Sequence, residues 1–165
     1  RNLVYFLREG YEVYGADSDG GAVEQVRRLA ASLAPGVAAN RFRNEPLERL
    51  TFPAGFADVA ISSAVLHFAA DDAQFDAMLR GTWRVLRPGG LLFCRLASTI
   101  GMEAQVRRIT GRRHQLPDGS ERFLVDEDLL LEYTRALGGT LEDPLKTTVV
   151  QNQRSMTTWV VRKGA

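Results

Sequence analysis

The 165-residue sequence has little of what disulfide, metal and membrane proteins need. It contains one cysteine and two histidines, so it can form no internal disulfide and offers no spaced cluster of soft metal ligands. No apolar run approaches the roughly 20 residues of a membrane-spanning helix, and the start shows no basic-then-apolar signal pattern. The Gly-x-Ser-x-Gly elbow of serine hydrolases is also missing. These absences favour a cytoplasmic protein without a metal centre.

An excess of charge of one sign is missing as well. The chain carries 21 basic and 20 acidic side chains, which leaves a formal net charge of +1. No overall field therefore recruits nucleic acid or an anionic membrane, and any anionic partner needs a local patch. With 45% hydrophobic residues, the length suits one domain with a sizeable core, and we expect a single domain over residues 1–165.

What is present is an alternation of two hydrophobic periods, which predicts a layered α/β fold with a doubly wound, Rossmann-like, mainly parallel sheet. Helical spacing covers four segments, at residues 2–9, 20–33, 72–87 and 129–137. Strand patterns cover residues 12–16, 37–42, 58–63, 91–96, 141–150 and 155–162. The short polar join at 151–154 predicts that the last two strands form an antiparallel pair.

Three further features refine this prediction. The strand at 58–63 is small or apolar throughout, so we expect it in the middle of the sheet with both faces covered. Pro88-Gly89-Gly90 is expected to end the preceding helix. Residues 97–125 are less regular and basic, and they are interpreted as a lid or substrate insertion.

Polar residues follow the predicted strands where open α/β sheets bind their ligands. Asp17 ends the strand at 12–16, and its carboxylate suits the two hydroxyls of a ribose. The same residue can instead form a turn and helix cap with Ser18 and Asp19, and the residues alone leave both interpretations open. The later strand ends carry Asn44-Glu45, Ser62-Ser63 and Ala97-Ser98-Thr99, all expected at one edge of the sheet.

The segment Arg84-Val85-Leu86-Arg87-Pro88-Gly89-Gly90, the strand ending at Asp17 and the run from Leu50 to Phe68 resemble class I S-adenosylmethionine-dependent methyltransferases. The similarity is to the type 11 group, which includes ubiquinone- and tellurite-resistance-type enzymes. It implies S-adenosylmethionine as the cofactor and a small-molecule methyl acceptor, with no nucleic acid or membrane partner.

The resemblance also implies site residues. Asp17 would bind the ribose, Asn44 or Glu45 the adenine, and Ser63 would face the methionine moiety and the acceptor. The full set expected at the cofactor is Arg1, Asp17, Ser18, Asn44, Glu45 and Ser63. The set expected at the acceptor is His67, Ser98 and Arg113. No catalytic residue is assigned, because the leaving group of a sulfonium is already activated.

Two of these residues keep a second interpretation. His67 is either a proton acceptor or a packed histidine at the start of a loop. The basic cluster that runs from Arg107 to His114 is either a solvated surface or a source of one arginine, Arg112 or Arg113, that pairs with an anionic acceptor.

The glycine-rich cofactor loop of the family would end just before Arg1, so the first strand and this loop either precede the sequence shown or are truly missing. Gly20-Gly21 and Gly89-Gly90 follow other elements and do not replace it. Two other functions stay open. A nicotinamide-dependent oxidoreductase also places an acid at the Asp17 position, and a non-catalytic binding domain would keep the fold without the loop.

Overall fold

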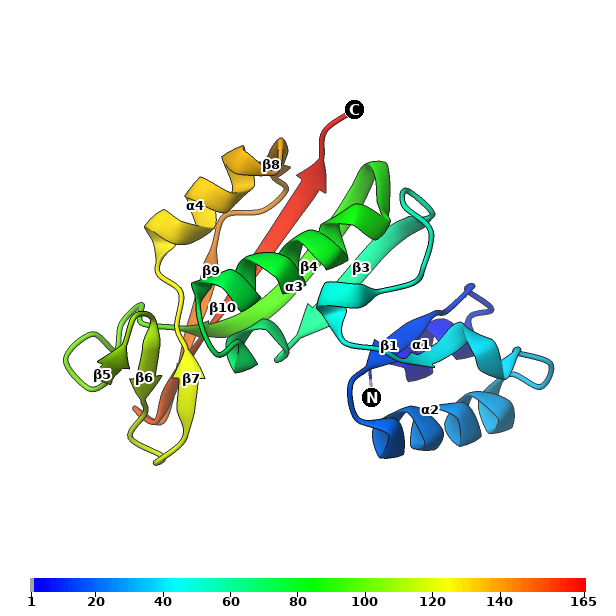
Figure 1. Cartoon of the computed structure of the whole chain (residues 1–165), viewed down its shortest axis with the longest axis horizontal. Helices are drawn as coiled ribbons and strands as arrows, with labels where there is room; N and C mark the ends of the chain where they lie inside the picture. Colours follow the sequence, from blue (N-terminus) through cyan, green and yellow to red (C-terminus); the bar gives the residue numbers. More distant parts are fainter. Residues whose placement is uncertain (1) are drawn as a thin grey trace. The chain divides into compact units, whose positions relative to one another are not determined.

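The computed structural model describes residues 2–165 and divides into two compact units, Arg1–Thr51 and Phe52–Ala165 (Figure 1). The single domain expected over residues 1–165 stays a prediction.

The first unit pairs two short parallel strands with two helices. Its strands are in register from Gly15↔Phe42 to Asp17↔Asn44. Asp19 caps the second helix, since its carboxylate accepts a 2.8 Å hydrogen bond from the Gly21 amide. In chain order the elements are α1 (Leu3–Arg8), β1 (Gly15–Asp17), α2 (Gly20–Leu33), a 3-10 turn (Ala39–Arg41), β2 (Phe42–Asn44) and a second 3-10 turn (Leu47–Arg49).

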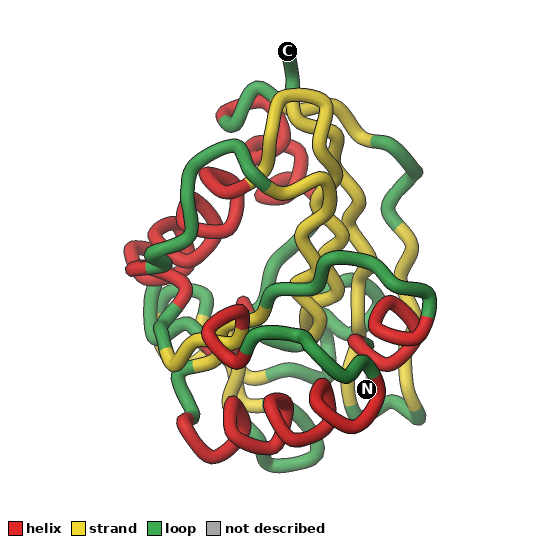
Figure 2. The backbone as a smooth tube through the Cα atoms, turned by 90° about the vertical axis from the view of Figure 1, so that its right-hand side faces the viewer, coloured by secondary structure: helices red, strands yellow, loops and turns green. Residues whose placement is uncertain are grey.

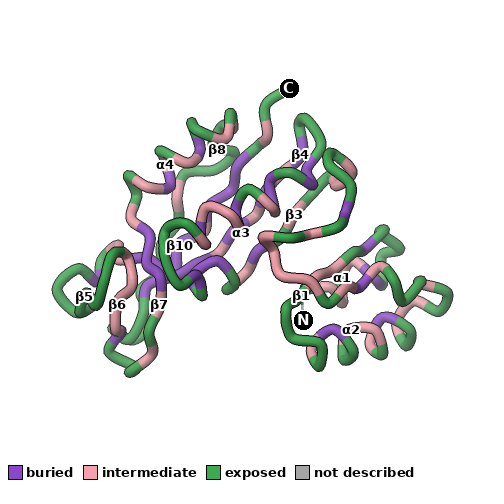
Figure 3. The backbone as a smooth tube through the Cα atoms, viewed as in Figure 1, coloured by how far each residue is buried: buried purple, intermediate pink, exposed green. Residues whose placement is uncertain are grey.

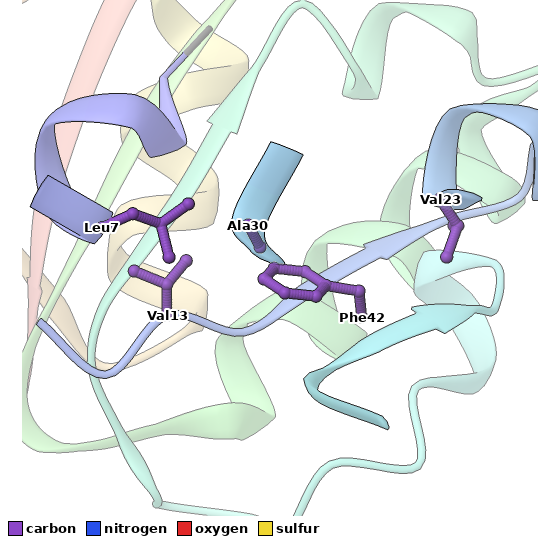
Figure 4. Close-up of a cluster of buried hydrophobic side chains, with 5 residues drawn as sticks. All are labelled: Leu7, Val13, Val23, Ala30 and Phe42. Atoms are coloured by element: carbon purple, nitrogen blue, oxygen red, sulfur yellow. The ribbon is translucent and has the colours of Figure 1, made fainter. Parts of the chain in front are cut away.

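The core of this unit is a small apolar cluster contributed by both helices, by β2 and by the segment just before β1 (Figure 4). The Phe42 ring lies at its centre and is almost fully buried. Arg27 of α2 donates hydrogen bonds of 2.7 and 3.1 Å to the Phe42 carbonyl, which fixes α2 against β2. The buried members are Leu7, Val13, Val23, Ala30 and Phe42.

Both strands of this unit start later than predicted. The segment expected as a strand over 37–42 is mostly a 3-10 turn, and β2 begins only at Phe42. The strand expected over 12–16 runs from Gly15 to Asp17. Alanines and Asn40 have weak strand propensity, so strand geometry is adopted only where the parallel partner is in register.

The second unit contains a five-stranded sheet in which β3, β4, β10 and β8 lie in that order and β9 pairs with β10. β3 and β4 are parallel, whereas β10 is antiparallel to β4, β8 and β9. The main elements are β3 (Ala57–Ser63), a 3-10 turn (Leu66–Phe68), α3 (Asp72–Val85), β4 (Leu86–Ser98), α4 (Glu127–Ala136), β8 (Gly139–Leu141), β9 (Lys146–Val150) and β10 (Arg154–Lys163). The α/β class with parallel pairs and a C-terminal antiparallel pair is confirmed.

Helices α3 and α4 both cover one face of this sheet (Figures 1 and 2). Trp159 of β10 points to that face, and its indole N–H donates a 3.0 Å hydrogen bond to the Thr134 hydroxyl of α4. Cys94, the register partner of Trp159 in β4, is fully buried on the same side. Burial raises the pKa of the Cys94 thiol to about 12, so this cysteine is a packed, unreactive side chain.

The expected central position of the strand at 58–63 is wrong for the described chain. β3 is the end strand of its sheet, and Figure 3 shows it less buried than β4. Val59 is 50% exposed and Ile61 is 42% exposed. Both lie on the face opposite the one that α3 and α4 cover, because side chains alternate along a strand.

The expected helix stop at Pro88-Gly89-Gly90 is also corrected. Helix α3 ends at Val85, and the Pro-Gly-Gly segment lies inside β4. Its pairing with β3 shifts register between Ala57↔Leu86 and Val59↔Leu91. Gly89 has φ of +74°, and a Cβ on Gly90 would lie 2.9 Å from the Arg87 carbonyl, so this irregularity needs both glycines.

The insertion at 97–125 forms a small antiparallel sheet of its own. It consists of β5 (Arg107–Thr110), β6 (Arg113–Gln115) and β7 (Glu121–Phe123). Leu116 and Leu124 pack with Ala97 of β4 and Met156 of β10. The insertion is therefore anchored to the main sheet by an apolar contact, and its role as a lid stays a prediction. Among residues 2–165, no helix is both long and apolar enough to cross a membrane.

Candidate functional site

Asp17 lies at the carboxyl end of β1, and one of its two carboxylate oxygens is hydrogen-bonded within the protein. Its Oδ1 accepts a 2.9 Å hydrogen bond from the Asp19 amide, which orients the side chain. Within residues 2–165, no hydrogen bond or ion pair engages Oδ2, and the residue is exposed. The turn and the helix cap that the sequence offered as an alternative are both present, because Asp19 is the cap residue and Asp17 supports the turn. The two interpretations are thus compatible.

Asn44 is held beside Asp17 by the parallel pairing. Its side-chain amide donates a 2.9 Å hydrogen bond to the Asp17 carbonyl, and the Glu45 amide donates a 3.0 Å bond to the same oxygen. The carbonyl is therefore saturated, and the turn after β1 is tied to the turn after β2. Because the side-chain nitrogen of Asn44 is used as a donor, its side-chain oxygen is the atom of this amide that can accept a hydrogen bond from a ligand.

The Glu45 carboxylate is occupied by Thr51. One oxygen accepts from the Thr51 amide at 2.8 Å, and the other accepts from the Thr51 hydroxyl. Burial opposes ionisation, but these bonds and the charge of Arg43 outweigh it and lower the pKa of Glu45. Of the two residues expected at an adenine ring, Asn44 has a side-chain oxygen that accepts no hydrogen bond from residues 2–165, whereas both carboxylate oxygens of Glu45 are bonded to Thr51. Neither contact is tested, and both stay predictions.

Ser63 ends β3 opposite Arg95 of β4. The next residue, Ala64, has φ of +61°, a left-handed conformation that costs a non-glycine residue about 1 kcal/mol or more. Its amide donates a 2.7 Å hydrogen bond to the Arg95 carbonyl, which holds the strained turn in place. This turn directs the chain away from the sheet immediately after Ser63. Such strain is common at ligand sites.

His67 is a buried histidine with a fixed tautomer. The Ala97 amide donates a 3.0 Å hydrogen bond to its Nδ1, so the neutral ring carries its proton on Nε2. Burial, and then the charges of Arg122, Arg95 and Arg154, lower the pKa of His67 to about 4. A ring in this state has no free lone pair for an incoming proton. The geometry favours the packed histidine over the proton acceptor.

Ser98 lies within a buried chain of hydroxyl groups. Thr157 donates to Ser98 at 2.7 Å, and Ser155 donates to the Ile100 carbonyl at 2.7 Å. The 3.2 Å contact between Ser98 and Ser155 is then donated by Ser98, since the Ser155 hydrogen is already in use. Both functions of the Ser98 hydroxyl are occupied. Its contact with an acceptor remains a prediction.

The arginines expected at an anionic acceptor are paired within the protein. Arg113 donates to the Ala69 carbonyl at 3.3 Å and forms a 3.2 Å ion pair with Glu121. Arg112 forms a 2.7 Å ion pair with Asp126 and lies 3.7 Å from Asp72. Arg112 also lines an open hollow of about 240 Å³ with Thr99, Arg108, Gly111, His114 and Asp126. The carboxylates balance much of the basic charge that the sequence shows here.

A second group of arginines, which was not predicted from the sequence, lies near His67. The guanidinium of Arg122 lies 4.7 Å above the Phe68 ring, and that ring is 4.7 Å from the His67 ring. Arg95 and Arg154 also lie close enough to His67 to lower its pKa. One signal was available in the sequence, because Arg95 interrupts the apolar run from Leu91 to Leu96. The other two come from segments far along the chain.

Two expected residues remain without a described contact. Arg1 lies outside the described residues. Ser18 is exposed in the turn between Asp17 and Asp19, and its cofactor contact stays a prediction. Among residues 2–165 there is no group of three or more histidine, cysteine, aspartate or glutamate side chains placed to hold a metal ion.

Comparison with known proteins places these features in a family. The profile of the family described as "Methyltransferase domain" matches residues 1–94, which is more than half of the chain. The match contains Asp17, Asn44, Ser63 and His67. No curated protein sequence matches the chain.

Solved structures share the fold at low sequence identity. A SAM-dependent methyltransferase from Methanosarcina mazei superposes with a TM-score of 0.75 at 17% identity, over 98% of this chain and 86% of that one. The 1,6-didemethyltoxoflavin-N1-methyltransferase of Burkholderia thailandensis, solved with 1,6-didemethyltoxoflavin and S-adenosylhomocysteine, gives 0.70 at 21% identity, over 100% of this chain and 67% of that one. A methyltransferase from Listeria monocytogenes, described as putative and S-adenosylmethionine-dependent, gives 0.71 at 13% identity, over 99% and 86%.

Proposed function

Because the chain belongs to the methyltransferase domain family, we propose that it transfers a methyl group from S-adenosylmethionine to a small-molecule acceptor. The observation that carries the proposal is the half-engaged carboxylate of Asp17 at the carboxyl end of a parallel strand. Open α/β sheets bind nucleosides at this position, and a carboxylate there accepts the hydroxyl protons of the ribose.

The polar atoms around Asp17 fit the nucleoside part of this cofactor. Asp17 Oδ2 is oriented by the bond to Oδ1 and is free to accept from a ribose hydroxyl. The side-chain oxygen of Asn44 is fixed by the bond that its amide nitrogen donates. An acceptor atom at this position suits the exocyclic amino group of an adenine. These groups orient a nucleoside and perform no chemistry on it.

The reaction asks little of the protein beyond alignment. Bound S-adenosylmethionine supplies a methyl group on a sulfonium, which is already an activated leaving group. The residues of the chain then position the acceptor and exclude water. This agrees with a chain in which His67 is buried with its Nδ1 bonded to a backbone amide and the Ser98 hydroxyl already donates one hydrogen bond and accepts another. The acceptor itself is not specified by these residues.

A binding comparison tests the proposal with a matched pair of variants. S-adenosylhomocysteine and NAD are titrated separately into the wild-type chain, Asp17→Asn and Asp19→Asn, with heat release as the readout. Asp17→Asn keeps the oxygen that orients the turn and replaces the other oxygen with an amide. We expect its affinity for S-adenosylhomocysteine to fall about tenfold or more, because a charge-assisted bond is lost.

Asp19→Asn is the control, because asparagine caps a helix as well as aspartate does. Its affinity should match that of the wild type. Binding of NAD in place of S-adenosylhomocysteine would point to an oxidoreductase. Binding of neither compound would point to a domain without this cofactor. Transfer of a labelled methyl group in an acceptor screen then identifies the substrate.

A further inference from the structure

Three arginines from separate parts of the second unit meet around His67. Arg95 belongs to β4, Arg122 to β7 and Arg154 to the start of β10. All three guanidinium groups act on the same imidazole, whose Nδ1 is bonded to the Ala97 amide. The three charges therefore all lie within electrostatic range of one fixed ring.

These charges have little compensation within the protein. In the described part of the chain, neither Arg95 nor Arg154 forms a salt bridge or a side-chain hydrogen bond. Arg122 donates a 2.6 Å hydrogen bond to the backbone carbonyl of Glu121, which carries no charge, and lies above the Phe68 ring. The acid that faces the group is Asp118, whose pKa is lowered by hydrogen bonds from Ser120 and then by Arg154 and Arg122.

The contrast with the neighbouring arginines is informative. Arg112 and Arg113 sit on the same insertion, and each forms an ion pair with a carboxylate. Three arginines near one carboxylate leave two positive charges in excess. Arg95 is also partly buried in a strand, and an unpaired guanidinium there is costly unless an anion joins it.

The strand register places this cluster at the carboxyl end of the main sheet. Arg95 lies opposite Ser63 of β3 and opposite Thr158 of β10. Side chains alternate along a strand, so Arg154 of β10 lies on the same face as Arg95. That face is opposite the one covered by α3 and α4. The insertion is anchored on it through Leu116 and Leu124, and this brings Arg122 of β7 alongside.

The ring of Phe68 adds an apolar surface at the same place. It is 57% exposed, although it lies between the His67 ring and the Arg122 guanidinium. The combination of unpaired guanidinium groups and an open aromatic ring suits a molecule that has a flat apolar part and an oxyanion. Arginine binds carboxylate and phosphate through paired N–H donors.

We propose that Arg95, Arg122 and Arg154 bind an oxyanion, carboxylate or phosphate, on the methyl acceptor. The identification of the bound molecule as the methyl acceptor rests on the proposed function, whereas the anion site itself rests on the arginines alone. The acceptor class that follows is a small acid, and Phe68 contacts its apolar part.

Three probes that share a phenyl ring test the site: benzoate, phenyl phosphate and neutral benzamide, which matches benzoate in size. Each is titrated into the full chain at low ionic strength and followed by amide chemical shifts in nuclear magnetic resonance spectra. Benzoate or phenyl phosphate should shift the amide signals of residues 66–68 and of the three arginines, and benzamide should not. The anion that binds more tightly identifies the head group. Because surface charges are screened by salt, binding should weaken as salt is added.

The variants Arg95→Gln, Arg122→Gln and Arg154→Gln remove one charge each. We expect the affinity for the preferred anion to fall about tenfold in Arg95→Gln, because Arg95 is partly buried whereas Arg154 is exposed. Arg107→Gln is the control, because Arg107 lies on the same insertion and donates to Gln115 at 2.6 Å. Arg95→Lys keeps the charge and should recover part of the affinity.

S-adenosylhomocysteine is titrated into the same samples to separate the two proposals. If it binds to no sample but benzoate or phenyl phosphate behaves as described, the methyl-transfer proposal fails and the anion site stands. If it binds and neither anion shifts the signals near His67, the anion site is wrong. Equal anion affinity in Arg95→Gln and Arg107→Gln would also overturn it.

Discussion

Asn44 and Asp17 are register partners at the ends of two parallel strands, and the Asn44 side chain donates a 2.9 Å hydrogen bond to the Asp17 backbone carbonyl. This bond joins the turn that orients the Asp17 carboxylate to the turn after β2. Since Asp19 both donates to Asp17 and caps α2, the position of the carboxylate depends on the strand pair and the helix together.

Asn44→Ala should therefore weaken both stability and cofactor binding. Loss of one partly exposed hydrogen bond lowers the free energy of unfolding by about 1 kcal/mol, as measured by urea denaturation. The affinity for S-adenosylhomocysteine should fall as well, because the turn that orients Asp17 is loosened. Asn40→Ala, in the 3-10 turn before β2, is the control. Unchanged S-adenosylhomocysteine affinity in Asn44→Ala would show that Asn44 supports no nucleoside site.

His67 should make the protein less stable in mild acid. Its pKa is about 4 in the folded chain against an ordinary value of 6.5, so below pH 6.5 the unfolded chain takes up a proton that the folded chain does not. The free energy of unfolding falls from pH 6.5 to about pH 4 and levels off below. Between pH 7 and pH 5 the loss from this residue is about 2 kcal/mol.

The variant His67→Asn isolates this contribution. Asparagine offers an oxygen to the Ala97 amide and does not titrate, so the difference in stability between pH 7 and pH 5 should shrink by about the same 2 kcal/mol. A pH dependence that is the same in His67→Asn and the wild type would mean that the imidazole is not held neutral by its surroundings.

Asp126 has two functions that substitution can separate. Its Oδ1 accepts from the Leu129 amide at 2.9 Å and caps α4, while its Oδ2 accepts from Arg112 at 2.7 Å. Asp126→Asn keeps the cap and weakens the ion pair, and Asp126→Ala removes both. We expect Asp126→Ala to lose about 1 kcal/mol more than Asp126→Asn in chemical denaturation.

Asp71 provides the comparison for this pair. It caps α3 through a 2.8 Å bond from the Gln74 amide. Asp71→Asn should be close to the wild type, whereas Asp71→Ala should lose about 1 kcal/mol. If Asp126→Asn is as stable as the wild type too, the ion pair with Arg112 contributes nothing measurable.

The hydroxyl chain around Ser98 should be sensitive to removal of its middle member. Thr157 is fully buried, donates to Ser98 at 2.7 Å and contacts the Thr147 hydroxyl at 2.8 Å. Thr157→Val removes the donor to the Ser98 hydroxyl and the partner of the Thr147 hydroxyl, so the free energy of unfolding should fall by about 1–3 kcal/mol. Thr148→Val, at an exposed position of β9, should be near neutral. Equal stability of the two variants would contradict an ordered chain of hydroxyls.

The sequence predicted the features that short stretches of chain decide. The family recognition and the α/β class are confirmed, and so are the Asp19 cap and the C-terminal antiparallel pair. Each depends on hydrophobic period, capping chemistry or turn residues within a few positions. The strand limits near Phe42 and the helix stop at Pro88 were wrong because pairing with a neighbouring strand decided them.

Only the tertiary structure decided which polar groups meet. The sequence placed Ser98 and His67 at strand ends. It did not show that Thr157 donates a hydrogen bond to Ser98 or that the Ala97 amide donates one to the His67 ring. It also selected Arg112 and Arg113, whose charges are paired, and passed over Arg95 and Arg154, which form no ion pair within residues 2–165. The physical reason is distance along the chain: periodicity sets which side of its own element a residue faces, whereas antiparallel register and the docked insertion bring charges together from segments dozens of residues apart.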